Sequence, residues 1–252
     1  MKLDDARRVD AVIFVTDVDA PVLTPEDAHH LVDVLRLRPG SKVLAADGNG
    51  TYRACTLAED EKAPRKSRSS RVALARLHPD SPTQSEQRLE PEIGVGLCLG
   101  KGERPEWAIQ KLTELGVDEI LLLDSTRGVV RPDDEATERR LARLRRVARE
   151  AAMQCRRLRL PVIAGPIPLS QAIGSAPRPV ALAEPGAPPI DASVSSVFVG
   201  PEGGFTPDEL DLAPLVVGLP GYVLRSETAA VVAGALLAAY RVAATNSAEN
   251  IT

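Results

Sequence analysis

Residues 197–210 read VFVGPEGGFTPDEL, and this stretch predicts a strand, a glycine turn and a helix start in close succession. Its first three apolar residues are typical of a short buried strand. Thr206 is the predicted N-cap, a proline follows it in the first helical turn, and Glu209 completes a capping box. A turn of this kind commonly binds phosphate, but Glu202 would repel one. The stretch therefore favours a ligand that carries positive charge.

A second loop of the same kind follows at residues 219–230, which read LPGYVLRSETAA. Like the first loop, it combines a glycine with charged residues and leads into a predicted helix. One such loop alone is often only a tight turn, but two of them favour a ligand site. Backbone N–H groups can hold an adenine and a ribose, and carboxylates suit a sulfonium and an ammonium group. S-adenosylmethionine has all of these groups, and we expect it as the cofactor.

The composition is that of an ordinary globular protein, with 252 residues, 44% hydrophobic and 26% charged. The N-terminus lacks the apolar segment of a signal peptide, and the apolar run Ala229–Tyr240 is too short to span a bilayer. We therefore expect a cytoplasmic protein without a membrane partner. Three scattered cysteines and three histidines show no metal-ligand spacing, so no metal site is expected. The net charge of -4 gives no global sign of nucleic-acid binding.

Turn and linker signals divide the chain into two parts. Within residues 1–78, short β-rich runs surround one helix expected from Pro25 to Leu37, and Asp47–Gly50 predicts a hairpin turn. These features predict a small β-barrel. Residues 79–91 contain three prolines and read as a linker. From 92 to 247, apolar strands alternate with helices, and this alternation predicts an α/β domain with a parallel sheet.

A glycine-rich stretch at residues 94–107, GVGLCLGKGERPEW, allows two interpretations. It resembles the phosphate turn of a dinucleotide fold, with Asp124 as the ribose-binding acid. However, Gly94 and Gly96 fall inside the predicted strand rather than in the turn after it. A buried strand that contains glycines is therefore the favoured interpretation.

A long helix is expected from Glu135 to Arg159, and it carries many arginines. Leu141, Leu144, Ala148, Ala151, Cys155 and Leu158 form its predicted apolar face. The rest of the stretch holds nine arginines, namely Arg139, Arg140, Arg143, Arg145, Arg146, Arg149, Arg156, Arg157 and Arg159. A solvated charged face explains such a pattern, and so does recognition of RNA phosphates, which arginine binds bidentately. The basic run from Lys62 to Arg71 is interpreted as a solvated hairpin loop.

Several motifs together resemble one known family. In chain order they are DAHHLVDVLRLRPG, the DGNG hairpin, KGERPEWAIQKLTELGV, EAAMQCRRLRLP, VGPEGGFTPDEL and VLRSETAA. They resemble the RsmE family of 16S ribosomal RNA uridine-N3 methyltransferases in the SPOUT superfamily. The resemblance implies a PUA-like RNA-binding barrel followed by a SPOUT methyltransferase domain with a C-terminal trefoil knot. It also implies a homodimer whose knot loops hold the cofactor. The chain departs from the family at Leu219–Tyr222, where the family usually has L-G-x-R.

The resemblance and the loop chemistry together imply the site residues. The expected cofactor-binding residues are Leu182, Glu184, Gly200, Glu202, Gly203, Gly204, Leu219, Gly221, Leu224, Arg225 and Thr228. The expected contacts to RNA are Arg36, Arg127, Arg143, Arg146, Gln154 and Arg157. Gln154 is expected because an amide can read a base edge.

The chemical step needs a group that stabilises charge on uracil as its N3 proton leaves. Arg225 is the first candidate and Arg157 the second, while Glu227 or solvent accepts the proton. The predicted partner is 16S ribosomal RNA, alone or within the small ribosomal subunit. Two other functions stay open. One is a SPOUT methyltransferase for another RNA position, such as a ribose 2′-hydroxyl, and the other is a non-catalytic RNA-binding protein.

Overall fold

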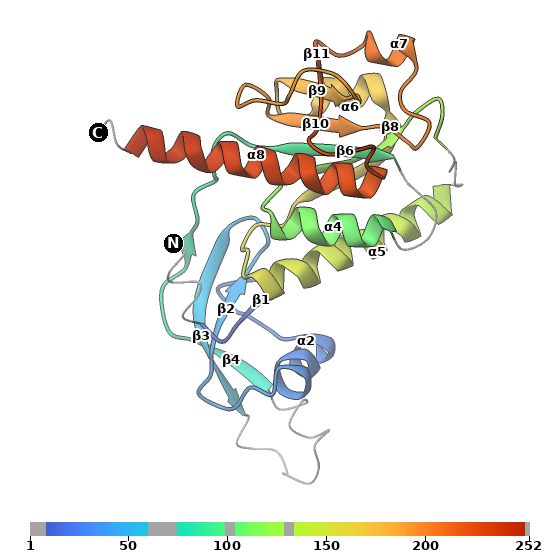
Figure 1. The fold of residues 1–252 in the computed structure, drawn as a ribbon. Helices are drawn as coiled ribbons and strands as arrows, with labels where there is room; N and C mark the ends of the chain where they lie inside the picture. The colour runs from blue at the N-terminus through green and yellow to red at the C-terminus, as the bar shows by residue number, and fades with distance from the viewer. Residues whose placement is uncertain (1–8, 60–74, 99–103, 129–133, 250–252) are drawn as a thin grey trace. The chain divides into compact units, whose positions relative to one another are not determined.

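The computed structural model describes residues 9–59, 75–98, 104–128 and 134–249. The chain forms two compact units (Figure 1). Unit 1 comprises residues 1–88 together with 152–160, and unit 2 comprises residues 89–151 and 161–252. The first unit therefore includes a short segment, residues 152–160, from the middle of the chain.

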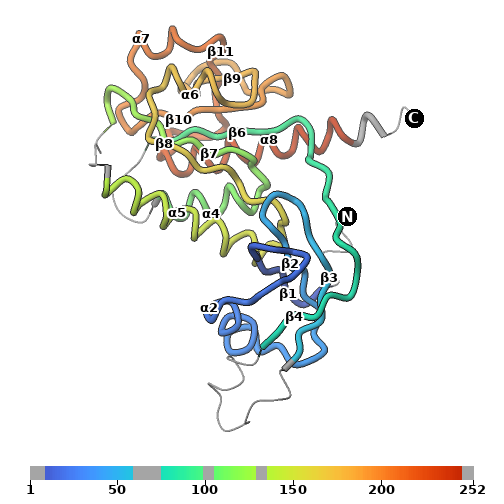
Figure 2. Tube along the Cα trace, turned by 180° about the vertical axis from the view of Figure 1, so that it is seen from behind, coloured from blue at the N-terminus to red at the C-terminus, as the bar shows by residue number. Residues whose placement is uncertain are grey.

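Unit 1 is built on a small sheet, seen from behind in Figure 2. Its strands are β1 (Ala11–Phe14), β2 (Lys42–Ala46), β3 (Thr51–Glu59), β4 (Ala75–Pro79) and β5 (Gln84–Ser85). The order is β1-β2-β3-β4, with β5 paired to β3; β1 and β2 run parallel and the other pairs antiparallel. The strand β5 lies within the stretch expected to be an unstructured linker. The basic run at residues 62–71 lies outside the described residues.

The predicted hairpin turn between β2 and β3 is confirmed. The carboxylate of Asp47 accepts hydrogen bonds from the amides of Asn49 (2.6 Å) and Thr51 (3.0 Å). The Arg159 side chain lies against this turn and donates to the carbonyl oxygens of Asn49 and Glu86. A side chain at Gly50 would collide with the Arg159 guanidinium. The φ of +95° at Gly50 favours glycine, and a side chain there would also displace the Arg159 guanidinium.

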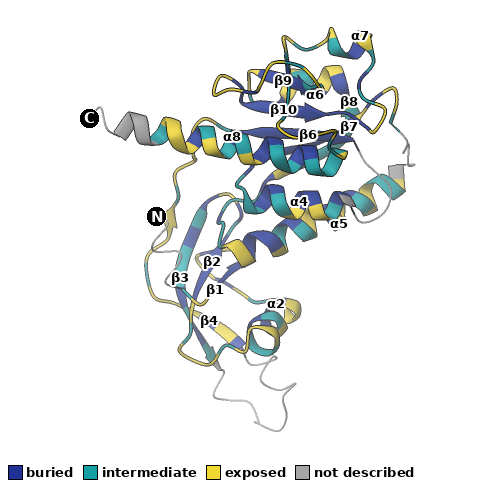
Figure 3. Cartoon of the chain, in the orientation of Figure 1, coloured by how far each residue is buried: buried dark blue, intermediate teal, exposed yellow. Residues whose placement is uncertain are grey.

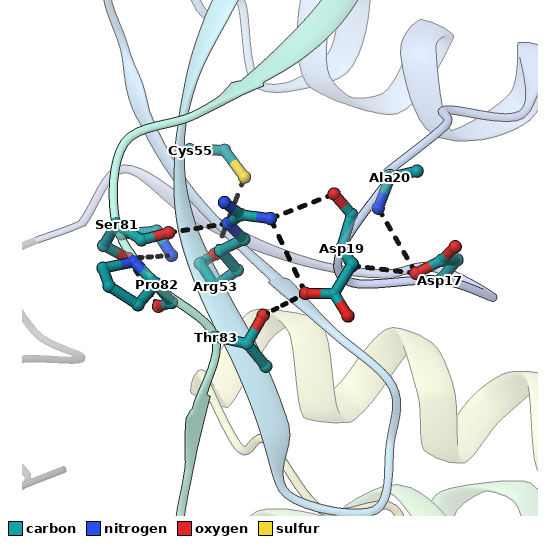
Figure 4. A network of polar contacts seen from close by, with 9 residues as sticks. Asp17, Asp19, Ala20, Arg53, Cys55, Ser81, Pro82 and Thr83 are labelled. Carbon is teal, nitrogen blue, oxygen red and sulfur yellow. Dashed lines mark hydrogen bonds and ion pairs between the residues drawn. The ribbon is translucent and has the colours of Figure 1, made fainter.

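Arg53 on β3 connects two other chain segments of unit 1, as Figure 4 shows. Its guanidinium donates to the carbonyl oxygen of Ser81 (2.6 Å) and to that of Asp19 (3.0 Å). The carboxylate of Asp19 also accepts a hydrogen bond from the Thr83 hydroxyl. This one arginine therefore fixes the loop after β1 against the segment after β4.

The helix after Thr24 is shorter than predicted. Its N-cap is confirmed, since the Thr24 hydroxyl accepts a hydrogen bond from the Asp27 amide (3.1 Å). However, α2 ends at His29, and a π-helical turn, η1 (His30–Val34), follows it. The chain then turns at Arg36, whose φ of +56° is left-handed. The expected helix to Leu37 is therefore wrong.

Unit 2 contains a six-stranded parallel sheet in the order β11-β9-β10-β6-β7-β8. Its strands are β6 (Gly94–Cys98), β7 (Glu119–Asp124), β8 (Val162–Pro168), β9 (Val180–Ala183), β10 (Ser196–Val199) and β11 (Leu215–Val217). Its helices are α4 (Arg104–Glu114), α5 (Asp134–Cys155), α6 (Leu169–Ser175), α7 (Pro207–Leu210) and α8 (Ser226–Glu249). The parallel α/β architecture predicted from the sequence is confirmed.

Side-chain alternation along the strands divides the core of unit 2 into two layers. Val197 and Val199 of β10 belong to the cluster that also contains buried residues of α4, α5 and α8. Phe198, between them, belongs to a second cluster with residues of α6 and with Phe205. Both faces of the sheet are therefore covered, and its central strands β6 and β10 are buried throughout (Figure 3).

The glycines of β6 lie inside the strand and allow close packing against β10. A Cβ atom at Gly96 would lie 2.5 Å from the Phe198 ring, and one at Gly94 would lie 2.5 Å from the Ser196 hydroxyl. The favoured interpretation as a buried strand is therefore confirmed, and the dinucleotide-type turn is wrong.

The long helix α5 ends at Cys155 instead of Arg159. Arg156 has a left-handed φ of +63°, which stops the helical hydrogen bonding. Leu141 and Leu144 pack in the core of unit 2, whereas Leu158 packs in that of unit 1. Cys155 is exposed, so its assignment to the apolar face is wrong.

The C-terminal helix α8 packs against α4, β6 and β10. A Cβ atom at Gly234 would lie 2.6 Å from the side chain of Leu112, so this glycine brings α8 close to α4. By length and composition alone, Ser226–Thr245 could cross a membrane, with a mean hydropathy of 1.5. A core helix of a globular protein meets the same criterion, and 33% of this apolar segment is buried in the fold.

A buried ion pair holds the C-terminal half of α8. Arg241 is 4% exposed and donates to the carboxylate of Asp118 (2.6 Å) and to the carbonyl oxygen of Gly116 (2.8 Å). Asp118 also accepts a hydrogen bond from the amide of Ile93 (3.0 Å). The pair therefore ties α8 to the turn before β7 and to the start of β6.

We expect Arg241→Ala to lower the free energy of unfolding by about 3 kcal/mol, because it leaves Asp118 without its buried partner. Chemical denaturation monitored by circular dichroism measures this change. Arg139→Ala is the matched control, since Arg139 pairs with Glu135 on the surface and should contribute less than about 1 kcal/mol. Equal effects of the two substitutions would contradict the anchoring role of Arg241.

Candidate active site

Three loops leave the sheet of unit 2 at the same edge and the same level. Strands β9, β10 and β11 run parallel, and Ala183 is paired with Val199 on one side and Val217 on the other. Glu184, Gly200 and Gly218 therefore begin three adjacent loops. In parallel α/β sheets, ligands bind beyond the carboxyl ends of the strands, and this edge is the candidate site.

Gly218 allows the loop after β11 to approach the loop after β9. Its amide donates to the carbonyl oxygen of Pro188 (2.6 Å), and its own carbonyl oxygen accepts from Ile190 (3.3 Å). A Cβ atom at position 218 would collide with the carbonyl oxygen of Ala187. Sequence reasoning missed this residue, because a glycine at the end of an apolar run does not reveal which backbone it approaches.

The loop after β10 is a compact turn. The amide of Gly204 donates to the carbonyl oxygen of Pro201 (2.8 Å), and its φ of +68° favours glycine. Gly200 is buried, and a Cβ atom there would lie 3.2 Å from the Phe205 amide nitrogen. By contrast, Glu202 and Gly203 are exposed. The turn therefore presents one carboxylate and unobstructed backbone to solvent.

A carboxylate and a guanidinium brace this turn against the loop after β7. Glu209 completes the predicted capping box with Thr206, and its carboxylate also accepts a hydrogen bond from the Thr126 amide (2.8 Å). Arg127 donates to the carbonyl oxygens of Gly203 (2.7 Å) and Phe205 (3.3 Å). The capping box was predictable from the spacing of Thr206 and Glu209. The hydrogen bond from the Thr126 amide to Glu209 was not, because the two residues are 83 positions apart in the chain.

The Glu209 carboxyl is buried, with 7% of the residue exposed. Burial acts to raise its pKa, but the hydrogen bonds from the Thr206 and Thr126 amides outweigh burial, and the pKa is lowered. The carboxylate form is thus the one that this part of the structure stabilises.

The exposed loops offer the donors and charges that the predicted cofactor needs. The amides of Gly186, Gly203 and Gly221 have no hydrogen-bond partner within the described part of the chain, nor have those of residues 222–225. Glu184 and Glu202 supply carboxylates beside them. Amides suit the polar edges of an adenine and a ribose, and carboxylates suit cationic groups. The residues present therefore fit S-adenosylmethionine.

The other predicted cofactor-binding residues differ in how deeply their side chains are buried. Leu182 is fully buried in β9, within the core cluster that contains Phe198. Leu219 and Leu224 pack against the core from the two ends of the loop after β11. Thr228 is half-buried in the first turn of α8.

The three predicted catalytic residues are not all in one unit. Arg225 is exposed immediately before α8, and Glu227 is half-buried in its first turn. Arg157 lies in the segment 152–160, which belongs to unit 1, as does Gln154. No group of three or more His, Cys, Asp or Glu side chains in the described ranges could hold a metal ion.

The arginines of α5 are used in several ways. Arg143 pairs with Glu106 of α4 (3.1 Å), and Arg145 donates to the carbonyl oxygen of Ile163 (3.1 Å). Arg146 is exposed, as is Arg36 in unit 1. The set predicted to contact RNA thus includes both side chains engaged in the fold and side chains directed to solvent.

Comparisons with known proteins place the chain in a family. Residues 87–238 match the family described as an RNA methyltransferase domain, and residues 23–63 match an RNA methyltransferase PUA domain. Ribosomal RNA small subunit methyltransferase E of Mycobacterium tuberculosis is 32% identical over 84% of this chain and 83% of its own. The chain belongs to this methyltransferase family. The protein of the same name from Bacillus subtilis is 27% identical over 82% of this chain and 85% of its own.

Solved structures of similar methyltransferases agree with the fold. A methyltransferase from Legionella pneumophila, in complex with S-adenosylmethionine, superposes with a TM-score of 0.74 at 26% identity, over 92% of this chain and 98% of that one. The family member from Neisseria gonorrhoeae, also bound to S-adenosylmethionine, gives a TM-score of 0.69 at 26% identity, over 89% and 95% of the chains. The family predicted from the motifs is therefore confirmed.

We expect Glu209→Gln to destabilise this methyltransferase by about 1.5–3 kcal/mol, because it removes hydrogen bonds to a charged acceptor. A carboxyl whose folded pKa lies below its unfolded value, about 4.3, stabilises the fold above that pH and loses this contribution as the pH falls through the folded pKa. The difference between wild type and variant should therefore be constant above about pH 5 and shrink below about pH 4. Denaturation at several pH values measures it.

Asp208→Asn is the control for this experiment, since Asp208 is an exposed carboxylate in the same helical turn. It should show a smaller loss than Glu209→Gln. A pH-independent difference between Glu209→Gln and wild type would contradict the role of the charged form.

Proposed function

We propose that this protein is an S-adenosylmethionine-dependent methyltransferase for uridine N3 in 16S ribosomal RNA. One observation carries the proposal: the loops that follow β9, β10 and β11 converge at one edge of the sheet, with unpaired amides, two carboxylates and Arg225. The names of the related proteins support the ribosomal RNA of the small subunit as the substrate. These names do not state the base, which is proposed from the family resemblance of the motifs.

The site residues proposed for the cofactor are those of the three loops. The amides of Gly203 and Gly221 would hold its polar edges, and Glu184 and Glu202 would balance its positive charge. S-adenosylmethionine, when bound, supplies an activated methyl group. The main task of the protein is then to align the nucleophile, and such positioning can contribute roughly 7–11 kcal/mol.

Arg225 is proposed to stabilise the developing charge on uracil. Loss of the N3 proton spreads negative charge onto the two neighbouring carbonyl oxygens, and a guanidinium directed at them stabilises it. Arg225 is exposed and is positioned between the packed residue Leu224 and the first turn of α8. Glu227, two residues further on, is the proposed proton acceptor, with solvent as the alternative.

The remaining parts of the proposal concern organisation. The PUA-like RNA-binding domain would correspond to unit 1, which extends beyond the expected residues 1–78 to residue 88 and also includes residues 152–160. The expected linker 79–91 therefore falls mostly within unit 1, and the SPOUT domain with a C-terminal trefoil knot would comprise the rest of the expected range 92–247. A cytoplasmic homodimer is proposed from the same family resemblance. The exposed Arg36 and Arg146 are the proposed phosphate contacts.

Nucleoside analysis tests this function directly. We expect 3-methyluridine in ribosomal RNA from cells that carry the gene and its loss when the gene is deleted, as measured by mass spectrometry. The wild-type gene restores it as the control. A 2′-O-methylated nucleoside instead would favour the ribose methyltransferase, and a protein that binds RNA but no S-adenosylmethionine would favour the non-catalytic binder.

A substitution of Arg225 separates catalysis from binding. We expect Arg225→Ala to lower the single-turnover rate about 10²–10³-fold at saturating cofactor, as removal of one preorganised donor does elsewhere. Arg225→Lys keeps the charge but loses the planar fork, so it should recover only part of the rate. If Arg225→Ala weakens cofactor binding, measured by calorimetry, but keeps a normal single-turnover rate, the catalytic role of Arg225 is refuted.

A further inference from the structure

The Tyr222 side chain, in the loop after β11, is almost fully exposed to solvent. Its exposed fraction is 99%, and that of its neighbour Val223 is 87%. The ends of the same loop are fixed, because Leu219 and Leu224 pack against the core. Gly221, with a φ of +108°, turns the backbone just before the tyrosine. A packed scaffold therefore holds the ring away from the protein.

This exposure is unusual among the aromatic residues of the chain, which has one tryptophan, three tyrosines and three phenylalanines. All three phenylalanines and Tyr52 are buried, and the Tyr240 hydroxyl donates to the carbonyl oxygen of Ile190 (3.0 Å). Trp107 is 44% exposed. A tyrosine with 99% of its surface exposed adds little to the stability of the fold, and its ring is accessible to another molecule.

The proposed reaction requires an unpaired base, and an aromatic ring can cover the base faces that unpairing exposes. Uracil N3 lies on the Watson–Crick edge, so the target uridine must be unpaired before it reacts. Unpairing and unstacking leave base faces open to water. Proteins that bind single-stranded RNA cover such faces with aromatic side chains, and this stacking tolerates any base.

We propose that Tyr222 stacks on an unpaired base of the RNA substrate next to the target uridine. The inference rests on the proposed function and adds a base-stacking subsite to it. Tyr222 precedes Arg225 by three residues in the same loop, so a base on its ring lies beside the group proposed to act on the uracil. The exposed guanidinium of Arg225 supplies one cationic group in this loop that an RNA phosphate or base oxygen could contact.

Binding of a single-stranded RNA oligonucleotide that contains the target uridine tests the subsite. We expect Tyr222→Ala to weaken RNA binding by roughly 5- to 150-fold, the range that aromatic–base stacking spans in alanine substitutions. Tyr222→Phe keeps the ring and should bind like wild type. Val223→Ser removes an equally exposed apolar group without a ring and is the matched control. The salt dependence of RNA binding should not change in Tyr222→Ala, because the substitution removes no charge.

A fluorescence reporter checks the contact itself. In a Trp107→Phe background, Tyr222→Trp places the only tryptophan of the chain at the tip of the loop. Stacking predicts that the same RNA quenches its emission, while a double-stranded RNA in which the target uridine is paired quenches it less. Equal RNA affinity of Tyr222→Ala and wild type, or no quenching at the reporter, overturns the inference.

Two further results would distinguish a dimer contact of Tyr222 and a failure of the proposed function from base stacking. If Tyr222→Ala shifts the protein from dimer to monomer in sedimentation and Tyr222→Phe does not, the ring contacts a second copy of the chain and the inference is wrong. If wild type binds the RNA but forms no 3-methyluridine in it, the proposed function fails. Loss of RNA affinity in Tyr222→Ala, with methylation by wild type intact, supports both.

Discussion

The close approach of two backbones at Gly218 is the constraint on which the candidate site depends. Because position 218 has no side chain, the loop after β11 bonds to Pro188 and Ile190 of the loop after β9. The parallel pairing of β9 with both β10 and β11 then brings three loops to one level. A larger residue would separate two of these loops, although every strand pairing could remain. The site is thus a consequence of sheet topology combined with one backbone contact.

Braces from elsewhere in the chain hold these loops. The Glu209 carboxylate binds the Thr126 amide, and Arg127 binds the carbonyl oxygens of Gly203 and Phe205. The two side chains play opposite chemical roles. The Glu209 carboxylate accepts from a backbone amide, whereas the Arg127 guanidinium donates to two backbone carbonyl oxygens. The carbonyl oxygens of Gly203 and Phe205 are therefore bonded, whereas the Gly203 amide has no partner in the described part of the chain. This division lets a rigid turn keep a polar surface for binding.

Much of the fold and the identity of the site loops could be predicted from the sequence, because periodicity, capping and turn signals are local. The capping box of Thr206, the Asp47–Gly50 hairpin and the strand around Gly96 all follow from neighbouring residues. The errors concern where two helices end, and the apolar periodicity that predicted the helices continues past both ends. The helix after Thr24 widens into a π turn, and α5 ends at Cys155 before a left-handed arginine. The roles of Gly218 and Arg127 depend on atoms far away in sequence, which no local pattern reveals.

Arginine illustrates why composition alone cannot define an RNA surface. Many arginines on one stretch suggested phosphate binding, yet Arg145 and Arg159 donate to backbone carbonyl oxygens and Arg143 pairs with Glu106. A guanidinium has five donors in a fixed plane, so it can bind the carbonyl groups of turns as well as the oxygens of a phosphate. The net charge of -4 fits this picture, because acidic residues offset the basic ones over the whole chain. Under the proposed function, recognition of RNA would depend on exposed groups such as Arg146 and Arg225, through their positions rather than their number.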